Sequence, residues 1–247
     1  MPQILKLFGF DHAVVWRGVP LSIDQPAFFW ESPDGSRVRA EYLSAGYGNG
    51  SDMPAEASQL RERIEMFLEV QGGLVGDPCL WMAGMDHEAP PAHLSRVVAE
   101  FQAQETLRAS THPDAQRYEL QIGSLTEYLE SVPSTNLQTH RGELRSGTRA
   151  NLLMGVASNR VDVKIAAARA ERTLERLAEP LCTLWSAEPI RDQPLLDLAW
   201  LEVIRNAAHD SICACSHDEV VDAVLHRYAE ATQTAQGVAR SAIEHAS

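Results

Sequence analysis

The chain has 247 residues, a formal net charge of −13 at pH 7 and a hydrophobic content of 45%, so it can form one large domain or two smaller ones with buried cores. Its acidic charge has no cluster of Lys and Arg to interrupt it and would repel a phosphate backbone, so we expect no nucleic-acid partner. No apolar run of about 18 residues and no signal peptide is visible, so we expect no membrane span. Four cysteines are too few for a disulfide scaffold, and reduced thiols in the cytoplasm are the default expectation.

The sequence pattern of residues 1–145 predicts an α/β layer in which strands and helices alternate. This order favours parallel strands. Short apolar runs at Val14–Trp16 and Leu80–Ala83 are typical of buried strands. A Pro-Asp-Gly turn at Ser32–Ser36 predicts a hairpin between two strands, residues 28–30 and 37–43. The other elements expected here are helices over residues 54–71, 90–101 and 124–132 and a strand over Tyr118–Ile122.

Residues 146–247 predict an all-α domain, because strand signals stop beyond a polar stretch between His140 and Asn151. Three long amphipathic helices with short links predict an antiparallel three-helix bundle. The first spans Val161–Leu177 with Ile165, Ala168, Arg172 and Leu177 near one face, the second is opened by Pro194, and the third is opened by a capping box at Ser216 and Glu219.

Polar side chains that follow strand ends are candidates for chemistry, because α/β folds place their sites there. Arg17 follows the first buried run, and Asp86 and His87 follow the second. Arginine grips hydroxyls and carboxylates, although each of these residues also fits a solvated loop or turn. Three aromatic residues could stack on a sugar or pack in a core: Trp30, Tyr42 and Tyr47.

The segment Ala207–Ser216 is the most informative stretch of the chain. A His209-Asp210 pair closes an apolar helical run, and a Cys-x-Cys turn follows it. Such a pair is commonly a cap or a solvated pair, but it is also what a metal or a polar substrate would use. A zinc site of Cys213 and Cys215 with the neighbouring histidines is too tightly spaced for paired zinc knuckles, so we expect the two thiols to be small buried groups.

In the segment Ala207–Ser216 and in several other stretches, the chain resembles the family 38 glycoside hydrolases. These are the retaining, zinc-dependent α-mannosidases, and the resemblance is greatest to the bacterial branch with mannosylglycerate hydrolases. The block from His209 to Ser216 is the most specific match. The other matching stretches are Met1–Leu5, Gly9-Phe10, Val14–Gly18, Trp30-x-x-Pro33-Asp34-Gly35-Ser36, Gly84-x-Asp86-His87, Gly123-Ser124-Leu125-x-Glu127-Tyr128 and Gly155-x-x-Ser158-x-Arg160.

The resemblance implies a fold of α/β plus all-α class, a partial parallel α/β barrel over residues 1–145 followed by a three-helix bundle over residues 146–247. It implies hydrolysis of terminal α-mannosidic bonds with retention, on a mannoside or mannosylglycerate-type carbohydrate. It implies that Asp86 is the general acid/base, that Arg17 and Asp210 contact the substrate, and that His209 is a zinc ligand. We add His87 as a neighbouring binding residue. We expect His209 and Asp210, at the C-terminal end of their helix, to face the strand ends.

The chain departs from the family pattern in its nucleophile and metal ligands. The family carries a His-x-Asp pair near the start of its catalytic domain, whereas the only early His and Asp of this chain, Asp11-His12, belong to a different motif. The family's Asp-x-Phe-Gly-His stretch, which carries the nucleophile, does not occur in this sequence. Retaining glycosidases need two carboxylates, and one imidazole holds a metal weakly, so we expect the isolated chain to be inactive and zinc to be held only in the complete enzyme. Unpaired sheet edges predict possible homo-oligomers. The alternative hypothesis is a non-catalytic helical interaction module with an α/β appendage.

Overall fold

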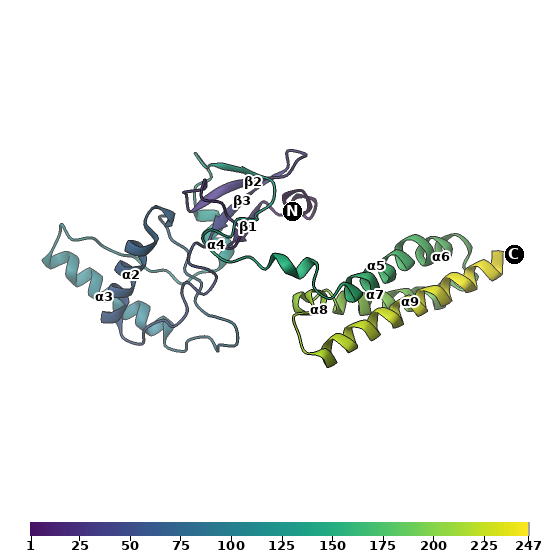
Figure 1. The fold of residues 1–247 in the computed structure, drawn as a ribbon. Helices are drawn as coiled ribbons and strands as arrows, with labels where there is room; N and C mark the ends of the chain where they lie inside the picture. The colour runs from purple at the N-terminus through teal and green to yellow at the C-terminus, as the bar shows by residue number, and fades with distance from the viewer. Residues whose placement is uncertain (247) are drawn as a thin grey trace. The chain divides into compact units, whose positions relative to one another are not determined.

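The structure, a computed structural model, describes residues 1–246. Contacts divide the chain into two compact units, residues 1–152 and the residues from Leu153 onward. Figure 1 shows the first unit in purple to teal, with a small sheet and several helices, and the second in green to yellow, built of helices. No helix in the described part of the chain has both the length and the apolar character that crossing a bilayer requires.

The sheet of the first unit has four strands in the order β1-β3-β2-β4. β2 and β3 form the predicted hairpin, with Phe28 opposite Ala40. β1 lies parallel to β3 and β4 lies parallel to β2, so the sheet is mixed, and the expected parallel arrangement holds only for its two outer pairs. The strands are β1 (His12–Val15), β2 (Ala27–Glu31), β3 (Arg37–Tyr42) and β4 (Thr139–Arg141), and helix α1 (Pro2–Leu7) precedes them.

β3 lies at the centre of this unit and is buried on both faces. Ala40 and Tyr42 on one face pack against Phe28 in an apolar core. Arg39 and Glu41 on the other face are buried as well, and an Arg39 Nη1 N–H donates to Glu41 Oε2 at 2.8 Å. The strand therefore separates an apolar layer from a buried ion pair.

Helix α4 (Leu125–Ser131) satisfies the remaining carboxylate oxygen of that ion pair. The Tyr128 hydroxyl donates to Glu41 Oε1 at 2.7 Å. A capping box fixes the start of α4, because the side chains of Ser124 and Glu127 bind each other's backbone N–H groups. The helix predicted over residues 124–132 is thus confirmed, and it anchors the charged face of β3.

Helices α2 (Ala57–Gln71) and α3 (Leu94–Thr111) lie side by side beyond the sheet (Figure 1), and a single-turn helix, η1 (Gly72–Leu74), follows α2. Leu60 from α2 and Phe101 from α3 are almost fully buried in a second core. A partly buried ion pair joins the two helices between Arg61 and Glu105.

The strands predicted at Leu80–Ala83 and Tyr118–Ile122 are wrong, because neither segment joins the sheet. Both run as irregular connections, and their apolar residues Trp81 and Leu120 pack on the α2–α3 core. The predicted burial of Leu80–Ala83 is wrong as well, because Leu80, Trp81 and Met82 are only partly buried and Ala83 is exposed. Periodicity alone could not tell whether a second strand would be available to pair with them.

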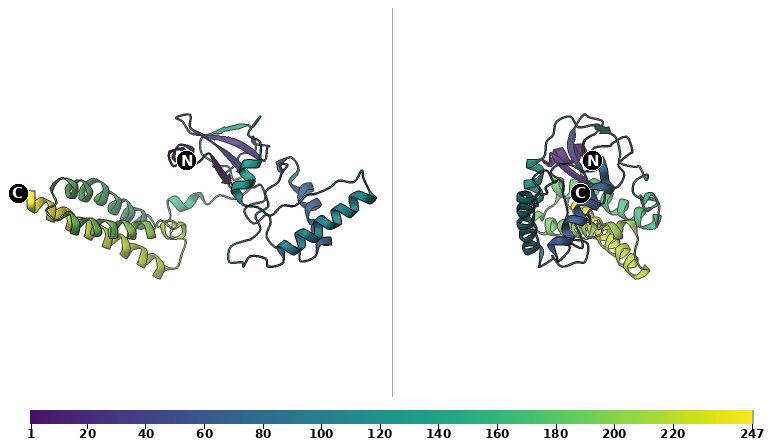
Figure 2. Two further views of the ribbon diagram at one scale, coloured as in Figure 1. Left: turned by 180° about the vertical axis from the view of Figure 1, so that it is seen from behind. Right: turned by 90° about the vertical axis from the view of Figure 1, so that its left-hand side faces the viewer.

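The second unit consists of helices, and no strand occurs in its described residues 153–246. Figure 2 shows its longer helices running along one another. The apolar core lies between them and draws on Leu174, Leu196 and Val224. Its elements are η2 (Met154–Ala157), α5 (Val161–Thr173), a π-helical stretch η3 (Leu174–Ala178), α6 (Glu179–Trp185), α7 (Pro189–Arg205), α8 (His209–Cys213) and α9 (Asp218–Ala246).

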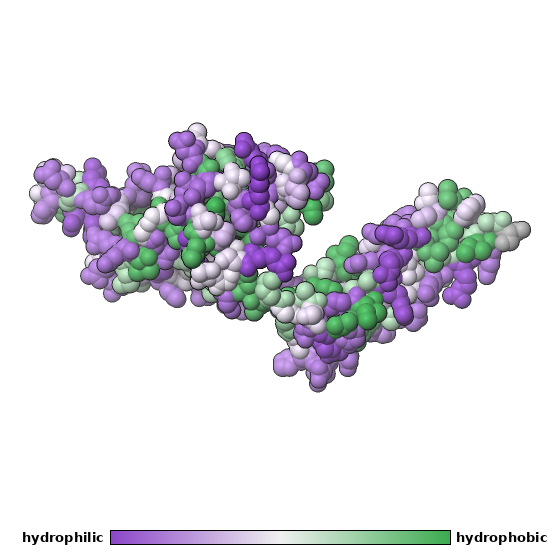
Figure 3. Space-filling view, turned by 45° about the horizontal axis from the view of Figure 1, so that its top comes forward, coloured by the Kyte–Doolittle hydropathy of each residue, from purple (hydrophilic) through white to green (hydrophobic). Residues whose placement is uncertain are grey.

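The predicted inner face of α5 is wrong. Ile165 is 57% exposed and Leu177 is 42% exposed, whereas Val163 and Ala170 are fully buried. The buried face carries small residues because α5 packs closely along α9, and large side chains are left on the outside. Hydrophilic residues cover much of the visible surface in Figure 3, but green apolar patches remain on this unit.

Two predicted helix starts are also corrected. α7 begins at Pro189, so Pro194 lies inside the helix instead of opening it. α9 begins at Asp218, one residue later than a cap at Ser216 would place it. Pro180 lies in the first turn of α6, directly after η3. The wider π-turn before it gives room to the ring, which would clash with a carbonyl in a regular helix.

Glu105 tests the link between α2 and α3. Burial favours the neutral acid, but hydrogen bonds from Arg61 and from the Tyr118 N–H outweigh it and lower the pKa of Glu105 below 4.5. We expect Glu105→Gln to lower the free energy of unfolding at pH 7 by about 3 kcal/mol. A carboxyl group whose pKa is lowered in the native state stabilises the fold above its unfolded pKa, and this stabilisation is lost as the pH falls below about 4.5. The free energy of unfolding of the variant, measured with denaturant, should therefore depend less on pH in that range.

The control for this prediction is Glu100→Gln. Glu100 pairs with Arg96 on the exposed face of α3, and surface pairs contribute little. Equal losses of stability for the two variants would show that burial of Glu105 does not matter.

Lys164 on α5 tests the packing of the second unit. Its side-chain nitrogen is buried and has no hydrogen-bond partner among residues 1–246. A buried, unpaired polar group costs free energy, so we expect Lys164→Met to raise the free energy of unfolding by about 1 kcal/mol. Thermal melts followed by circular dichroism provide the measurement. Lys6→Met at the exposed pair with Asp11 is the control, and a destabilised Lys164→Met variant would contradict the account.

Candidate active site

The candidate site lies at one edge of the sheet, where the parallel strands β1 and β3 both end. Trp16 and Arg17 follow β1 directly, and Tyr47 lies in the loop that follows β3. The guanidinium carbon of Arg17 lies 4.5 Å from the centre of the Trp16 ring, and that ring meets Tyr47 edge-on at 5.5 Å between centroids. These contacts join the ends of two strands into one aromatic and cationic surface.

Asp86 joins this surface through Tyr47. The Tyr47 hydroxyl donates to Asp86 Oδ2 at 2.7 Å. The hydrogen bond to the carboxylate and its negative charge raise the pKa of Tyr47 above its ordinary value of 10. Two residues singled out from the sequence, Arg17 and Asp86, are thus brought into one cluster by two aromatic side chains. We call this cluster, made of Trp16, Arg17, Tyr47 and Asp86, the rim cluster.

Glycines allow the chain to make the tight turns of the rim cluster. Gly46 has a φ of +86°, and a Cβ there would lie 3.0 Å from the Trp16 ring. Gly18 has a φ of +89°, and the Leu144 backbone occupies the space that its Cβ would need. Both positions therefore require glycine for backbone angle and for space.

His87 has an unusual backbone conformation beside the acid candidate. Its φ is +65° and its side chain is exposed. Non-glycine residues rarely adopt this region, and such strain is frequent at functional sites. Gly84 precedes the pair with a φ of +149°, so the backbone turns sharply just before Asp86, as the sequence predicts.

The three aromatic residues considered for sugar stacking lie in different environments. Tyr42 is 4% exposed and belongs to the core. The Trp30 indole N–H donates to the Gly142 carbonyl at 2.7 Å. Tyr47 alone belongs to the rim cluster. Its sequence signal was only its place in a glycine-rich loop, which does not reveal a partner 39 residues away.

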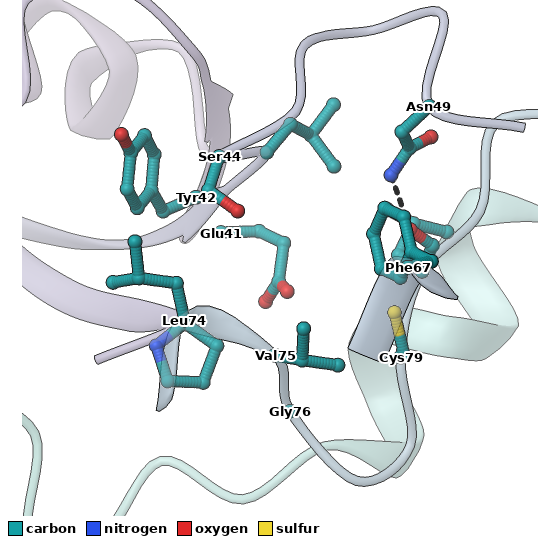
Figure 4. A pocket seen from close by; sticks show the side chains of 12 residues that line it. Glu41, Tyr42, Ser44, Asn49, Phe67, Leu74, Val75, Gly76 and Cys79 are labelled. Carbon is teal, nitrogen blue, oxygen red and sulfur yellow. Dashed lines mark hydrogen bonds between the residues drawn. The ribbon is translucent and has the colours of Figure 1, made fainter. Parts of the chain in front are cut away.

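A polar pocket lies at the charged face of β3 and is lined in part by Glu41, Asn49 and Cys79 (Figure 4). The Glu41 carboxylate and the Cys79 thiol both point toward it. Burial and the negative charge of Glu41 raise the pKa of Cys79 to about 11, although the residue as a whole is exposed. The thiol is thus protonated at neutral pH and is a poor nucleophile. Burial and the bond to Glu41 likewise raise the pKa of Tyr128.

The sequence analysis missed Glu41 and Tyr128. The signal for Glu41 was available, because Arg39 and Glu41 alternate with apolar residues along one strand and must therefore share a face. Tyr128 closes one of the stretches that match the family, and its role in this structure is to hold Glu41. Both residues belong to the buried charged face of β3.

His209 and Asp210 belong to the second unit, where they open helix α8. Their placement at the C-terminal end of a helix is wrong, because α7 stops at Arg205 and the pair lies in the first turn of the next helix. A first turn favours negative charge, not a cation. The side chains are 90% and 64% exposed, and His209 Nε2 lies 3.4 Å from Asp210 Oδ1.

The described residues do not form a metal centre. No group of three or more His, Cys, Asp or Glu suited to a metal ion occurs in residues 1–246, and a zinc site needs at least three protein ligands. The expectation that both thiols are buried is wrong, since Cys213 is half-buried and Cys215 is exposed. Ala214 between them caps the end of α8 with a φ of +55°, in the left-handed region.

Comparison with known proteins identifies a family match for the second unit and a relative for most of the chain. Residues 151–245 match the alpha mannosidase middle domain. The chain is 27% identical over 234 residues to a protein named as a candidate mannosylglycerate hydrolase from Halalkalibacterium halodurans, covering 89% of this chain and 25% of that protein.

Two solved structures are also similar to this chain. The structure of an alpha-mannosidase from Enterococcus faecalis V583 matches with a TM-score of 0.80 and 27% identity, over 100% of this chain and 28% of that one. A protein in the glycosyl hydrolase family 38 from Enterococcus faecalis shares the fold with a TM-score of 0.66 at 23% identity, over 99% of this chain and 25% of that one. This chain spans about a quarter of the length of the relatives it matches. It is therefore related to the family 38 glycoside hydrolases, and its residues 151–245 belong to the alpha mannosidase middle domain.

Proposed function

We propose that this chain is the part of an α-mannoside hydrolase that carries the general acid/base and one wall of the sugar site. The observation that carries the proposal is the rim cluster, in which Asp86, Tyr47, Trp16 and Arg17 meet at the ends of two parallel strands. This is the edge at which α/β folds place their substrates. The relatives named for α-mannosidase and mannosylglycerate hydrolase activity support the substrate class.

Asp86 would act on the glycosidic oxygen. Tyr47 holds Oδ2, so we assign the proton to Oδ1, the other oxygen of the same carboxyl group. In the first step the acid protonates the leaving oxygen, and in the second step its carboxylate removes a proton from water.

The remaining site residues would bind the sugar. Arg17 offers a fork of N–H donors to hydroxyl groups while its guanidinium stays on Trp16. His87 is a neighbouring binding residue, held beside Asp86 by its strained backbone. Asp210 would accept hydrogen bonds from sugar hydroxyls.

Retention of configuration requires a second carboxylate as nucleophile. The family's Asp-x-Phe-Gly-His stretch does not occur in this sequence, so we propose that the complete enzyme supplies the nucleophile from other residues. We also propose that zinc belongs to the complete enzyme, to which this chain contributes His209, and no step above depends on it. We further propose that the protein is cytoplasmic and that it can self-associate through the sheet edges β1 and β4.

The acid role of Asp86 is tested in a complete relative, at the aspartate that matches it. Replacement by Ala should lower kcat/KM by a factor of about 100 or more for mannosides with poor leaving groups. Aryl mannosides with good leaving groups need no protonation and should lose far less. Steady-state kinetics on both substrate types measure the difference.

The matched control replaces the aspartate that corresponds to Asp114, which is exposed in the loop after α3, and should leave both rates unchanged. Equal losses on good and poor leaving groups for the Asp86 variant would assign it a binding role instead of an acid role.

The purified 247-residue chain should not hydrolyse α-mannosides, because it supplies one of the two carboxylates that the reaction needs. Incubation with an aryl α-mannoside and zinc, followed by release of the chromophore, is the measurement. Turnover that persists through repeated purification would show that another carboxylate of this chain serves as nucleophile.

A further inference from the structure

We infer that Asn49 is a positioning residue that clamps together the two loops carrying Tyr47 and Asp86. Asn49 follows Tyr47 by two residues, and the segment it binds ends four residues before Asp86. The clamp itself is a property of this chain, and its importance for hydrolysis rests on the proposed function.

The Asn49 side chain uses both ends of its amide. Its Nδ2 donates to the Leu80 carbonyl at 2.8 Å, and its Oδ1 accepts from the Met82 N–H at 2.8 Å. Figure 4 shows the first of these bonds reaching across from the Asn49 loop. A residue in a neighbouring parallel strand binds the same two groups, the carbonyl before and the N–H after its partner. The amide thus replaces the strand that Leu80–Ala83 lacks.

The backbones of the two loops also lie in direct contact. A Cβ on Gly50 would lie 2.7 Å from the Met82 carbonyl oxygen, so only glycine allows this approach. The end of the Met85 side chain also lies close to Gly48. Residues 48–50 therefore fit closely against residues 80–85, and Asn49 provides the paired hydrogen bonds between the two segments.

Arg63 of helix α2 contacts both parts of the same junction. The Arg63 guanidinium donates to the carbonyls of Ser51 and Asp52, and it lies 5.5 Å from the centre of the Trp81 ring. One side chain thus contacts residues that directly follow the first loop and a residue of the second segment. With α2 fixing the base of the junction, the Asn49 amide sets the spacing of the two loops closest to the Tyr47–Asp86 bond.

The titration of Tyr47 reports the clamp without any need for activity. Tyrosines of the full chain carry a 13Cζ label, and the Tyr47 signal is the one missing from Tyr47→Phe. In the parent chain the Tyr47 pKa should lie above 10 because of Asp86. In Asn49→Ala the loops separate, and the Tyr47 pKa should fall to about 10, while that of Tyr128 stays raised by Glu41.

Gln102→Ala is the matched control, since it removes a comparable bond from a side-chain amide to the Leu120 carbonyl without touching either loop. It should leave the titration of Tyr47 unchanged. Asn49→Leu, which keeps a side chain of similar size but loses both the acceptor for Met82 and the donor to Leu80 without adding charge, should shift the Tyr47 pKa in the same direction as Asn49→Ala. An unchanged Tyr47 pKa in folded Asn49→Ala, or loss of the fold in both variants, would overturn the assignment.

Kinetics separate this inference from the proposed function. In a complete relative with Asn at the matching position, Asn→Ala should lower kcat for poor leaving groups and change KM little. A shifted Tyr47 titration in this chain with unchanged kcat in the relative would leave the clamp standing and contradict the role of Asp86 as the acid.

Discussion

The burial of β3 on both faces is the constraint on which the first unit depends. One face packs Ala40 and Tyr42 into an apolar core, and the other buries the Arg39–Glu41 pair. A buried ion pair is tolerable only when its remaining polar atoms are satisfied. The Tyr128 hydroxyl and the Pro133 carbonyl do this for Glu41 and Arg39. The strand is thereby fixed in position, and with it the loop that begins where β3 ends.

The rim cluster follows from that fixed end. β1 runs parallel to β3, so both strands deliver their next residues to the same edge. Arg17 reaches this edge on the Trp16 ring, and Tyr47 reaches it through a turn at Gly46. Asp86 arrives from a segment that is not a strand, and the glycine-rich loop holds that segment in place. Rigid strands and mutually clamped loops together give the carboxyl group a defined partner and orientation, as general acid catalysis requires.

The sequence predicted those parts of the fold that local pattern determines. The turn at Ser32–Ser36 and the alternation around it specified the β2–β3 hairpin, and helical spacing located α2. The same spacing found only part of α3, which begins at Leu94 instead of Pro90 and continues to Thr111. The apolar run at Leu80–Ala83 failed as a strand prediction because pairing depends on a partner far away in the sequence. The helix boundary before His209 failed because a short break after Arg205 carries no strong breaker residue.

Two site residues were accessible from sequence and two were not. Arg17 follows a true strand and Asp86 follows a sharp glycine turn, so their positions could be inferred. Tyr47 and Asn49 act through contacts that span about 30 to 40 residues, and a glycine-rich loop gives no local sign of such partners. Long-range side-chain contacts become visible only in the folded chain.

The central claim, that the rim cluster is the sugar-binding edge of this chain, is tested most directly by titrating the 15N-labelled chain with methyl α-mannoside and following its amide and indole N–H signals by NMR. The account predicts saturable shifts at the Trp16 indole N–H and at the backbone of Arg17, Tyr47 and Asp86, with weaker shifts for methyl α-galactoside. Unchanged signals at these residues up to saturating mannoside, or shifts confined to other surfaces, would contradict it.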